Sequence, residues 1–316
     1  MKRIGDKCYC KDKLLSPVTK YTELDPALCT ELRKIADAIL VPGKGLMACD
    51  ESPTSLDERF DELGIGNTES QRRDYRQMLF TADQSQLTRY ISGVVLHPET
   101  VYQKTTDGLN FVELLRQRNI LSGVKVDKGL IDLFGAKNEK ITEGLDSLQE
   151  RCIQYKRDGC HFAKWRCTYT ISETTPSQLA MITNANVLAR FSSICQSVRL
   201  VPIIEPEILN DGDYGINKTL EVHEEVMSIL FRTLNEHHVY LEGAILKPAM
   251  ILSGIKNAAN CTSQNAPMKI WGGQSENVER AQLALIERAR LCSEASLGTL
   301  QLNGMCTRKS SKPTVT

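Results

Sequence analysis

The sequence repeats one pattern six times: a short apolar run rich in Val, Ile and Leu, followed by a segment with helical periodicity. The apolar runs lie near residues 45–49, 92–96, 122–126, 160–166, 200–205 and 240–246. Runs of this kind are typical of parallel strands that are buried on both faces of a sheet. Because right-handed crossovers join such strands, the pattern predicts an α/β fold, either a barrel or a doubly wound sheet.

The segments between the runs carry apolar stripes at helical spacing, as Leu145, Leu148, Cys152 and Tyr155 do. One further helix is expected before the first strand, over residues 26–40. No Gly-x-Gly-x-x-Gly motif follows the first strand, which argues against a dinucleotide-binding sheet.

Charged residues stand at the end of every predicted strand. They are Asp50 and Glu51, His97 and Glu99, Lys125 and Asp127, Lys164 and Arg166, Glu205 and Glu207, and Lys247. A β/α barrel builds its active site from the carboxyl ends of its strands. Residues two apart on a strand share a face, so the pairs on the third, fourth and fifth strands are expected to meet in one cavity, joined by Lys247: Lys125 and Asp127, Lys164 and Arg166, and Glu205 and Glu207.

The charged set has the composition of an imine-forming site. Lys247 is the candidate nucleophile, and Lys164 is the cation that would favour its neutral form, since free lysine has a pKa of about 10.4. Glu205 and Glu207 could transfer protons, and Asp50 could take a proton from a substrate hydroxyl. The additional cations indicate an anionic, phosphorylated substrate. Each residue alone is also explained by a polar strand end or a structural ion pair, and only their combination favours an active site.

Charge, hydropathy and cysteine content argue against several other classes of protein. Lys+Arg and Asp+Glu are both 39 in 316 residues, so no net charge favours nucleic acid or an anionic membrane. No apolar run approaches the roughly 18 residues of a membrane span, and the N-terminus has no apolar signal-peptide core. The 11 cysteines are scattered and predict free thiols in a reducing cytoplasm. Cys8 and Cys10 form the one close pair, and no second pair completes a zinc site.

Several long segments carry a resemblance to a known family. They are ADAILVPGKGLMACDES (36–52), GVKVDKG (123–129), QYKRDGCHFAKWRC (154–167), NANVLAR (184–190), VPIIEPEIL (201–209) and HVYLEGAILKP (238–248). On these segments the chain resembles the class I fructose-1,6-bisphosphate aldolases of animals, from about Leu24 to Ala249 and again from Trp271 to Gly298.

The resemblance implies a TIM barrel that cleaves fructose 1,6-bisphosphate reversibly in glycolysis, with no metal and no other cofactor. Lys247 matches the Schiff-base lysine, Glu205 the acid/base glutamate and Glu207 the second glutamate. Lys164 matches the lysine that tunes the nucleophile, and Asp50 the aspartate that helps to break the C3–C4 bond. Lys125, Ser52, Ser55 and Arg59 match residues around the far phosphate, and Arg166 is a further candidate for substrate binding. The family also implies a homo-oligomer, expected to be a tetramer.

The chain departs from the family after Met250. The seventh and eighth βα units are missing, roughly 60 residues at about 30 for each unit. They carry a Ser-Gly-Gly-Gln loop and the arginine that holds the 1-phosphate, and the terminal tyrosine of the family is also absent. Ser275 lies in a similar Gly-Gln-Ser-Glu sequence, but it is interpreted mainly as a helix N-cap, with a replacement anion site at the exposed N–H groups as the alternative. Pro53 and Thr54 replace a Thr-Gly pair, which could shift the phosphate loop.

The expected fold is therefore an incomplete or distorted barrel of about six βα units, with free edges on its first and sixth strands. The expected organisation is a flexible extension (1–20), the barrel domain (21–298, with the deletion near 250–270) and a disordered tail (299–316). Three interpretations remain. The chain is an aldolase with impaired activity, a non-catalytic variant that acts as a scaffold or in mixed oligomers, or the product of a gene-model or splicing error.

Overall fold

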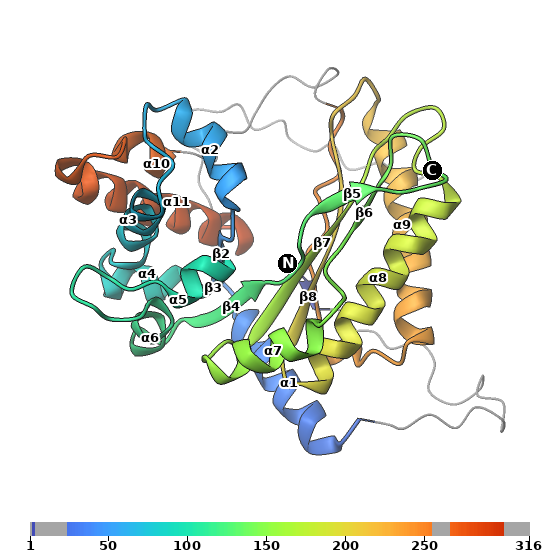
Figure 1. The fold of residues 1–316 in the computed structure, drawn as a ribbon, viewed down its shortest axis with the longest axis horizontal. Coiled ribbons are helices and arrows are strands. Elements are labelled where there is room, and N and C mark those ends of the chain that lie inside the picture. The colour runs from blue at the N-terminus through green and yellow to red at the C-terminus, as the bar shows by residue number, and fades with distance from the viewer. Residues whose placement is uncertain (1, 4–23, 255–265, 300–316) are drawn as a thin grey trace, which may run out of the picture.

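The computed structural model describes residues 2–3, 24–254 and 266–299, and Figure 1 shows how they are arranged. The strands are β1 (Lys2–Arg3), β2 (Gly45–Cys49), β3 (Ile91–Leu96), β4 (Leu121–Lys125), β5 (Leu130–Asp132), β6 (Lys140–Thr142), β7 (Phe162–Tyr169), β8 (Val201–Ile208) and β9 (Ile245–Leu246). The α-helices are α1 (Pro26–Ile39), α2 (Pro53–Asp61), α3 (Glu69–Phe80), α4 (Gln84–Tyr90), α5 (Pro98–Tyr102), α6 (Phe111–Gln117), α7 (Leu148–Arg157), α8 (Gln178–Ser197), α9 (Ile216–Glu236), α10 (Ala266–Trp271) and α11 (Val278–Ser296). Two 3-10 helices, η1 (Leu241–Gly243) and η3 (Ser275–Asn277), complete the set.

Six parallel strands lie side by side in the order β2-β3-β4-β7-β8-β9, which is also their order along the chain. This order is what consecutive βα units of a barrel produce. The sheet curls but does not close, because in the described part of the chain β2 pairs with β3 alone. The predicted incomplete barrel is thus confirmed.

The sixth predicted strand and its edge differ from expectation. Only Ile245 and Leu246 of the run 240–246 form a strand, because η1 turns the chain just before them. Their outer edge is not free, since β1 pairs with them in antiparallel fashion, Lys2 opposite Leu246. The prediction of two free edges is therefore wrong for β9 and confirmed for β2 within the described residues.

The last helix crosses to the other side of the opening. Helices α10 and α11 pack against each other, and α11 contacts α3, α4 and β2 (Figure 1). Trp271 of α10 stacks near Phe60 and Tyr75, with ring centroids 6.3 and 5.7 Å away. Helices α10 and α11 are thus packed beside β2, at one edge of the parallel sheet. Strand β9 and helix α9 lie toward the other edge.

The inner face of the curled sheet is closed at its amino end by α1. Leu32, Ala36 and Ile39 of this helix pack with the inward side chains of the strands, including Phe162. A Cβ on Gly123 would lie 2.0 Å from the Phe162 ring, so only glycine leaves room for the phenyl group. This packing fills the bottom of the barrel and leaves the carboxyl ends of the strands to the charged residues.

Two details of the sequence interpretation need correction. The segment between β4 and β7 is not only helical, because β5 and β6 form an antiparallel ribbon before α7. Ser275 does not cap α11: Asn277 occupies that position without a side-chain hydrogen bond, and Ser275 starts η3. The expected N-cap was wrong because a 3-10 turn precedes the helix.

Most of the expected extension (1–20, with Cys8 and Cys10) and most of the expected tail (299–316) lie outside the described residues. So does the middle of the deletion region, residues 255–265. None of the described helices combines the length and the apolar character that a membrane span requires.

Candidate active site

A chain of alternating charges runs across the carboxyl ends of the parallel strands. Asp50 Oδ2 accepts a hydrogen bond from Lys164 Nζ at 2.7 Å, and Lys164 Nζ lies 3.0 Å from Glu205 Oε2. The other carboxylate oxygen of Glu205 contacts Lys247 Nζ. Glu205 therefore joins the two lysines, one to each of its oxygens, across strands β7, β8 and β9.

Strand register explains why these residues meet. In β7 and β8 the residues Arg166 and Glu205 are register partners, and side chains alternate between the two faces. Lys164 and Glu205 thus face the interior, whereas Trp165 and Ile204 lie in the outer core. Ion pairing along one face of adjacent strands follows from this alternation.

Lys164 and Asp50 are held in their charged forms. Burial would lower the pKa of Lys164, but the carboxylates of Asp50 and Glu205 outweigh it and hold that pKa above its ordinary value. Burial would likewise raise the pKa of Asp50, but Lys164 outweighs this effect and, with help from Lys125, keeps that pKa below its ordinary value. The two side chains are 7% and 8% exposed, so this ion pair is almost dry.

Lys247 stands in a wetter position than Lys164. Its side chain is 36% exposed, whereas that of its partner Glu205 is 5% exposed. The difference follows from position, since Lys247 follows β9 at the opening of the sheet and Lys164 lies in β7 between two paired strands.

A second group of charges lies beside this chain. Lys125 Nζ pairs with Asp127 Oδ1 at 2.8 Å, and Asp127 Oδ2 accepts from the backbone N–H of Arg166 at 3.3 Å. The Arg166 guanidinium contacts Glu207, and both side chains are about one-third exposed. The charges at the strand ends thus form two contact sets rather than one, Asp50-Lys164-Glu205-Lys247 and Lys125-Asp127-Arg166-Glu207.

The residues expected around the far phosphate lie at the start of α2. Ser52 caps this helix, its Oγ accepting from Ser55 N at 3.1 Å, and the two hydroxyls are 3.0 Å apart. Pro53 occupies the first turn of α2, where the helix itself does not need its missing N–H. Arg59 is engaged by Glu51 at 3.1 Å and does not point freely at a ligand.

Sequence reasoning missed the group that holds this loop. Arg76 is 1% exposed, and its Nη2 lies 2.9 Å from Glu51 Oε2 and donates to the Glu51 carbonyl at 3.2 Å. Burial would lower the pKa of Arg76, but Glu51 outweighs it and raises that pKa. Arg76 lies in the middle of α3, where a charged residue is normally interpreted as part of a solvated helix face, so no sequence signal marked it.

Among the described residues, no group of three or more His, Cys, Asp or Glu side chains is arranged to hold a metal ion. The site is instead defined by lysines paired with carboxylates at the mouth of a β/α barrel. Fold and site together describe a barrel with the side chains for lysine-based catalysis.

Comparison with known proteins gives the family. The model of the class I fructose-bisphosphate aldolases matches residues 31–266. The chain is 52% identical over 278 residues to a fructose-bisphosphate aldolase of Drosophila melanogaster, covering 83% of this chain and 77% of the fly protein. It is also 52% identical over 330 residues to fructose-bisphosphate aldolase 1 of Caenorhabditis elegans, covering 85% of this chain and 90% of the worm protein. The chain belongs to the class I fructose-bisphosphate aldolase family.

A solved structure supports the fold, and the worm alignment supports the deletion. The fructose-bisphosphate aldolase of Plasmodium falciparum, crystallised with TRAP and a small-molecule inhibitor, superposes with a TM-score of 0.85 at 34% identity, covering 89% of this chain and 98% of that one. In the worm alignment, 85% of 316 residues is about 269, about 60 fewer than the 330 aligned positions, which is the size of two βα units of about 30 residues.

Proposed function

We propose that this chain performs the Schiff-base chemistry of its family on a phosphorylated ketose, with cleavage of fructose 1,6-bisphosphate impaired relative to complete relatives. The observation that carries the proposal is the contact of Glu205 with both Lys164 and Lys247. Through this contact Glu205 is positioned to accept a proton from Lys247, and the charged Lys164 lies against the other carboxylate oxygen of Glu205. Lys247 and Glu205 are thus the proposed centre of the reaction.

The proposed steps use the geometry directly. Glu205 takes a proton from Lys247, whose neutral Nζ then adds to the substrate ketone carbon. Glu205 returns the proton to the carbinolamine oxygen, which leaves as water and yields a protonated imine. Asp50 takes the proton of the C4 hydroxyl, the C3–C4 bond breaks, and its electron pair moves into the imine. Lys164 keeps Asp50 ionised until Asp50 accepts this proton, and Glu207 is the proposed second proton carrier.

Binding of the far phosphate is assigned to the cations and hydroxyls beside this centre. Lys125 and Arg166 would supply charge, and Ser52 and Ser55 would supply hydroxyl groups. Arg59 would join them only after it leaves Glu51, its present partner at 3.1 Å.

Impairment follows from the opening of the barrel. Phosphate in a β/α barrel is commonly held by the loops after strands seven and eight, and this chain lacks those units. The exposed Lys247 would also leave its imine open to water, which hydrolyses it. The proposed outcome is a lysine that forms the imine but holds the bisphosphate weakly.

Trapping the imine tests the proposal. The folded protein would be incubated with dihydroxyacetone phosphate and sodium borohydride, and the adduct located by mass spectrometry of peptides. We expect the added mass on Lys247, no adduct in Lys247→Arg, and full labelling in the control Lys269→Arg, which changes a lysine of α10. A folded protein without any adduct would reject the chemistry.

The alternative is a non-catalytic subunit in a mixed oligomer with complete aldolases, in the cytoplasm where the substrate pathway operates. The observation that favours it is the edge of β2, which has no strand on one side within the described residues. Co-expression with a tagged complete homologue tests it. Co-purification in fixed ratio without an adduct on Lys247 supports the alternative, and a monodisperse, active homo-oligomer contradicts it.

A further inference from the structure

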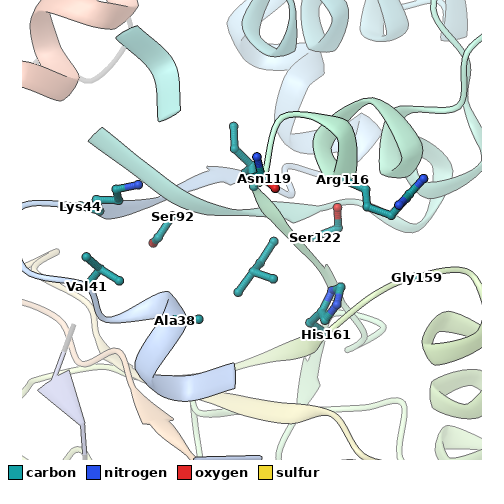
Figure 2. A pocket seen from close by; sticks show the side chains of 11 residues that line it. Ala38, Val41, Lys44, Ser92, Arg116, Asn119, Ser122, Gly159 and His161 are labelled. Atoms are coloured by element: carbon teal, nitrogen blue, oxygen red, sulfur yellow. The ribbon is translucent and has the colours of Figure 1, made fainter. Parts of the chain in front are cut away.

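A cavity of about 300 Å³ opens at the amino ends of the strands, at the end of the barrel opposite to the charged residues (Figure 2). It is lined by Ala38, Val41, Lys44, Ser92, Arg116, Asn119, Ile120, Leu121, Ser122, Gly159 and His161. These residues come from the end of α1 and from the segments that enter β2, β3, β4 and β7. The volume is at the lower end of the range for sites that bind small molecules.

One buried polar atom in this cavity lacks a partner within the described residues, Nδ1 of His161. Ser122 is 2% exposed as a residue and its hydroxyl makes no hydrogen bond to the described residues, but the oxygen itself is not fully buried. Ser92 provides the contrast, because its hydroxyl lines the same cavity but donates to the Ile39 carbonyl at 2.6 Å. Since buried polar groups are normally paired, the His161 nitrogen points to a missing ligand or water, and the Ser122 hydroxyl is available to the same ligand.

The charge around the cavity has one sign. No lining residue is acidic, and Lys44 extends toward the middle of the cavity, whereas the Arg116 guanidinium on the other side extends away from it (Figure 2). Arg116 is already paired with Glu113, at 2.6 Å. Lys44 has no ion-pair partner within residues 2–3, 24–254 and 266–299, so its charge is available to an anion.

The rest of the lining sets the shape of the ligand. Ala38, Val41, Ile120 and Leu121 form an apolar surface between the polar groups. Burial lowers the pKa of His161, and Lys156 lowers it further, so the neutral ring can donate or accept one hydrogen bond. A ligand that satisfies the whole cavity must therefore combine hydrogen-bonding anionic oxygens with a compact apolar body.

We propose that this cavity is a second binding site, distinct from the aldol site, for a small organic anion: a phosphate or carboxylate on a short apolar body. Its oxygens bind the Ser122 hydroxyl and the His161 ring, with Lys44 as the main source of positive charge. Its apolar body packs on Val41 and Ile120. Neither the imine chemistry nor the cation set of the barrel mouth uses any of these residues.

Calorimetric titration with phenyl phosphate and with benzoate tests the proposal and distinguishes the two anion types. Inorganic phosphate, which has the negative charge but no apolar group, serves as the control ligand. We expect one of the two aromatic probes to bind with one site per chain and more tightly than inorganic phosphate. A crystal soaked with that probe should show it against Ser122 and His161.

Substitutions in the cavity show which side chains contribute to the affinity for the probe. Lys44→Met should weaken the probe about tenfold, the effect of losing one charge-assisted hydrogen bond, and Ser122→Ala a few-fold, roughly 3-fold, without loss of folding because it removes an unpaired group. The control Lys34→Met, an exposed lysine on α1 outside the cavity, should change nothing.

A background that carries Lys125→Met and Lys247→Met separates the two sites, since it removes cations of the barrel mouth. Probe binding that survives in this background supports a separate site. The proposal is overturned if neither aromatic probe binds, if Lys44→Met and Ser122→Ala bind as the parent does, or if binding disappears in the double-variant background.

Discussion

The two lysines that share Glu205 lie in different parts of the barrel. Lys164 belongs to β7, a strand with paired neighbours on both sides, and its side chain is 7% exposed. Lys247 follows β9, a strand of two residues at the opening, and its side chain is 36% exposed. The same carboxylate thus bridges a dry, closed region and a wet, open one.

The comparison shows what the deletion changes and what it leaves. The closed region, β4 with β7 and β8, keeps its register and its buried ion pair because its neighbours are present. The open region retains Lys247, the proposed nucleophile, in contact with Glu205, but leaves its side chain 36% exposed. The proposed reacting groups therefore lie close together, whereas water, whose exclusion strengthens electrostatics in a site, reaches Lys247.

The largest expected effect is a loss of stability on substitution in the closed region. Lys164→Met leaves Asp50 and Glu205 buried without their common cation, so the free energy of unfolding should fall by about 3–5 kcal/mol. Lys247→Met should cost about 1 kcal/mol or less, because that side chain is partly solvated and Glu205 keeps Lys164. Urea denaturation of both variants measures the difference.

Equal losses in the two variants would contradict the comparison, since they would mean that the opening is as dry as the closed region. A larger loss in Lys247→Met than in Lys164→Met would reverse it.

The second effect concerns glycines in the two regions. Gly123→Ala would place a Cβ 2.0 Å from the Phe162 ring and should cost about 1–3 kcal/mol through overpacking. Gly45→Ala, at the open edge strand β2, meets nothing within 4 Å and should change stability by less than about 0.5 kcal/mol. Thermal unfolding compares them.

The pair Gly123→Ala and Phe162→Leu sharpens this test. If the clash with the ring is the cause, the smaller leucine side chain should restore part of the loss in the double variant, a coupling that a double-mutant cycle measures. Strict additivity would show that another contact is responsible.

The third effect is the dependence of stability on pH. The folded pKa of Asp50 lies below its ordinary value of 3.8, so its stabilisation is present above that pH and is lost as the pH falls through the folded pKa. The folded pKa of Lys164 lies above its ordinary 10.5, so its stabilisation is present below that pH and is lost as the pH rises through the folded pKa. Both contributions are therefore complete at neutral pH.

Asp50→Asn should flatten the acid limb of the stability curve by about one proton, or about 1.4 kcal/mol per pH unit at most. Lys164→Met should flatten the same limb, because Lys164 is the principal opposing charge. Denaturation between pH 2 and pH 5 measures the slope, and an unchanged slope in Asp50→Asn would show that another carboxylate dominates.

Much of this arrangement could be predicted from the sequence, for physical reasons. Strands β3, β7 and β8 each begin as short runs of mostly apolar residues, and the period of two in β7 and β8 places Lys164 and Glu205 on one face. The ion pair of Arg76 with Glu51 could not be predicted, because a buried charge in a helix has the same local sequence as an exposed one. The pairing of β1 with β9 could not be predicted either. An open sheet edge accepts strands of many sequences, so the sequence does not show which segment will pair there.

The smallest expected effect lies where the chain leaves the open region. Nε2 of His223 in α9 lies 3.3 Å from the Ala249 carbonyl, and Gly254 N donates to the Tyr214 carbonyl at 2.9 Å. Together with Thr219, whose hydroxyl donates to the Leu252 carbonyl at 2.8 Å, these contacts hold the segment after Lys247 against the start of α9.

His223→Leu keeps most of the buried volume but removes both ring contacts, that of Nδ1 with the Thr219 carbonyl at 2.8 Å and that of Nε2 with the Ala249 carbonyl. Because both partners are carbonyl acceptors, a ring with one N–H makes one of these two hydrogen bonds at a time. We expect a loss of about 1 kcal/mol or less, the net value of one hydrogen bond, together with faster hydrogen exchange of the Gly254 amide. Thr219→Val, one turn earlier in α9, is the matched change and should act in the same direction. If the Gly254 amide exchanges at the parental rate in both variants, the contacts with α9 are not what holds the segment after Lys247. The open region is then more rigid than its exposure indicates.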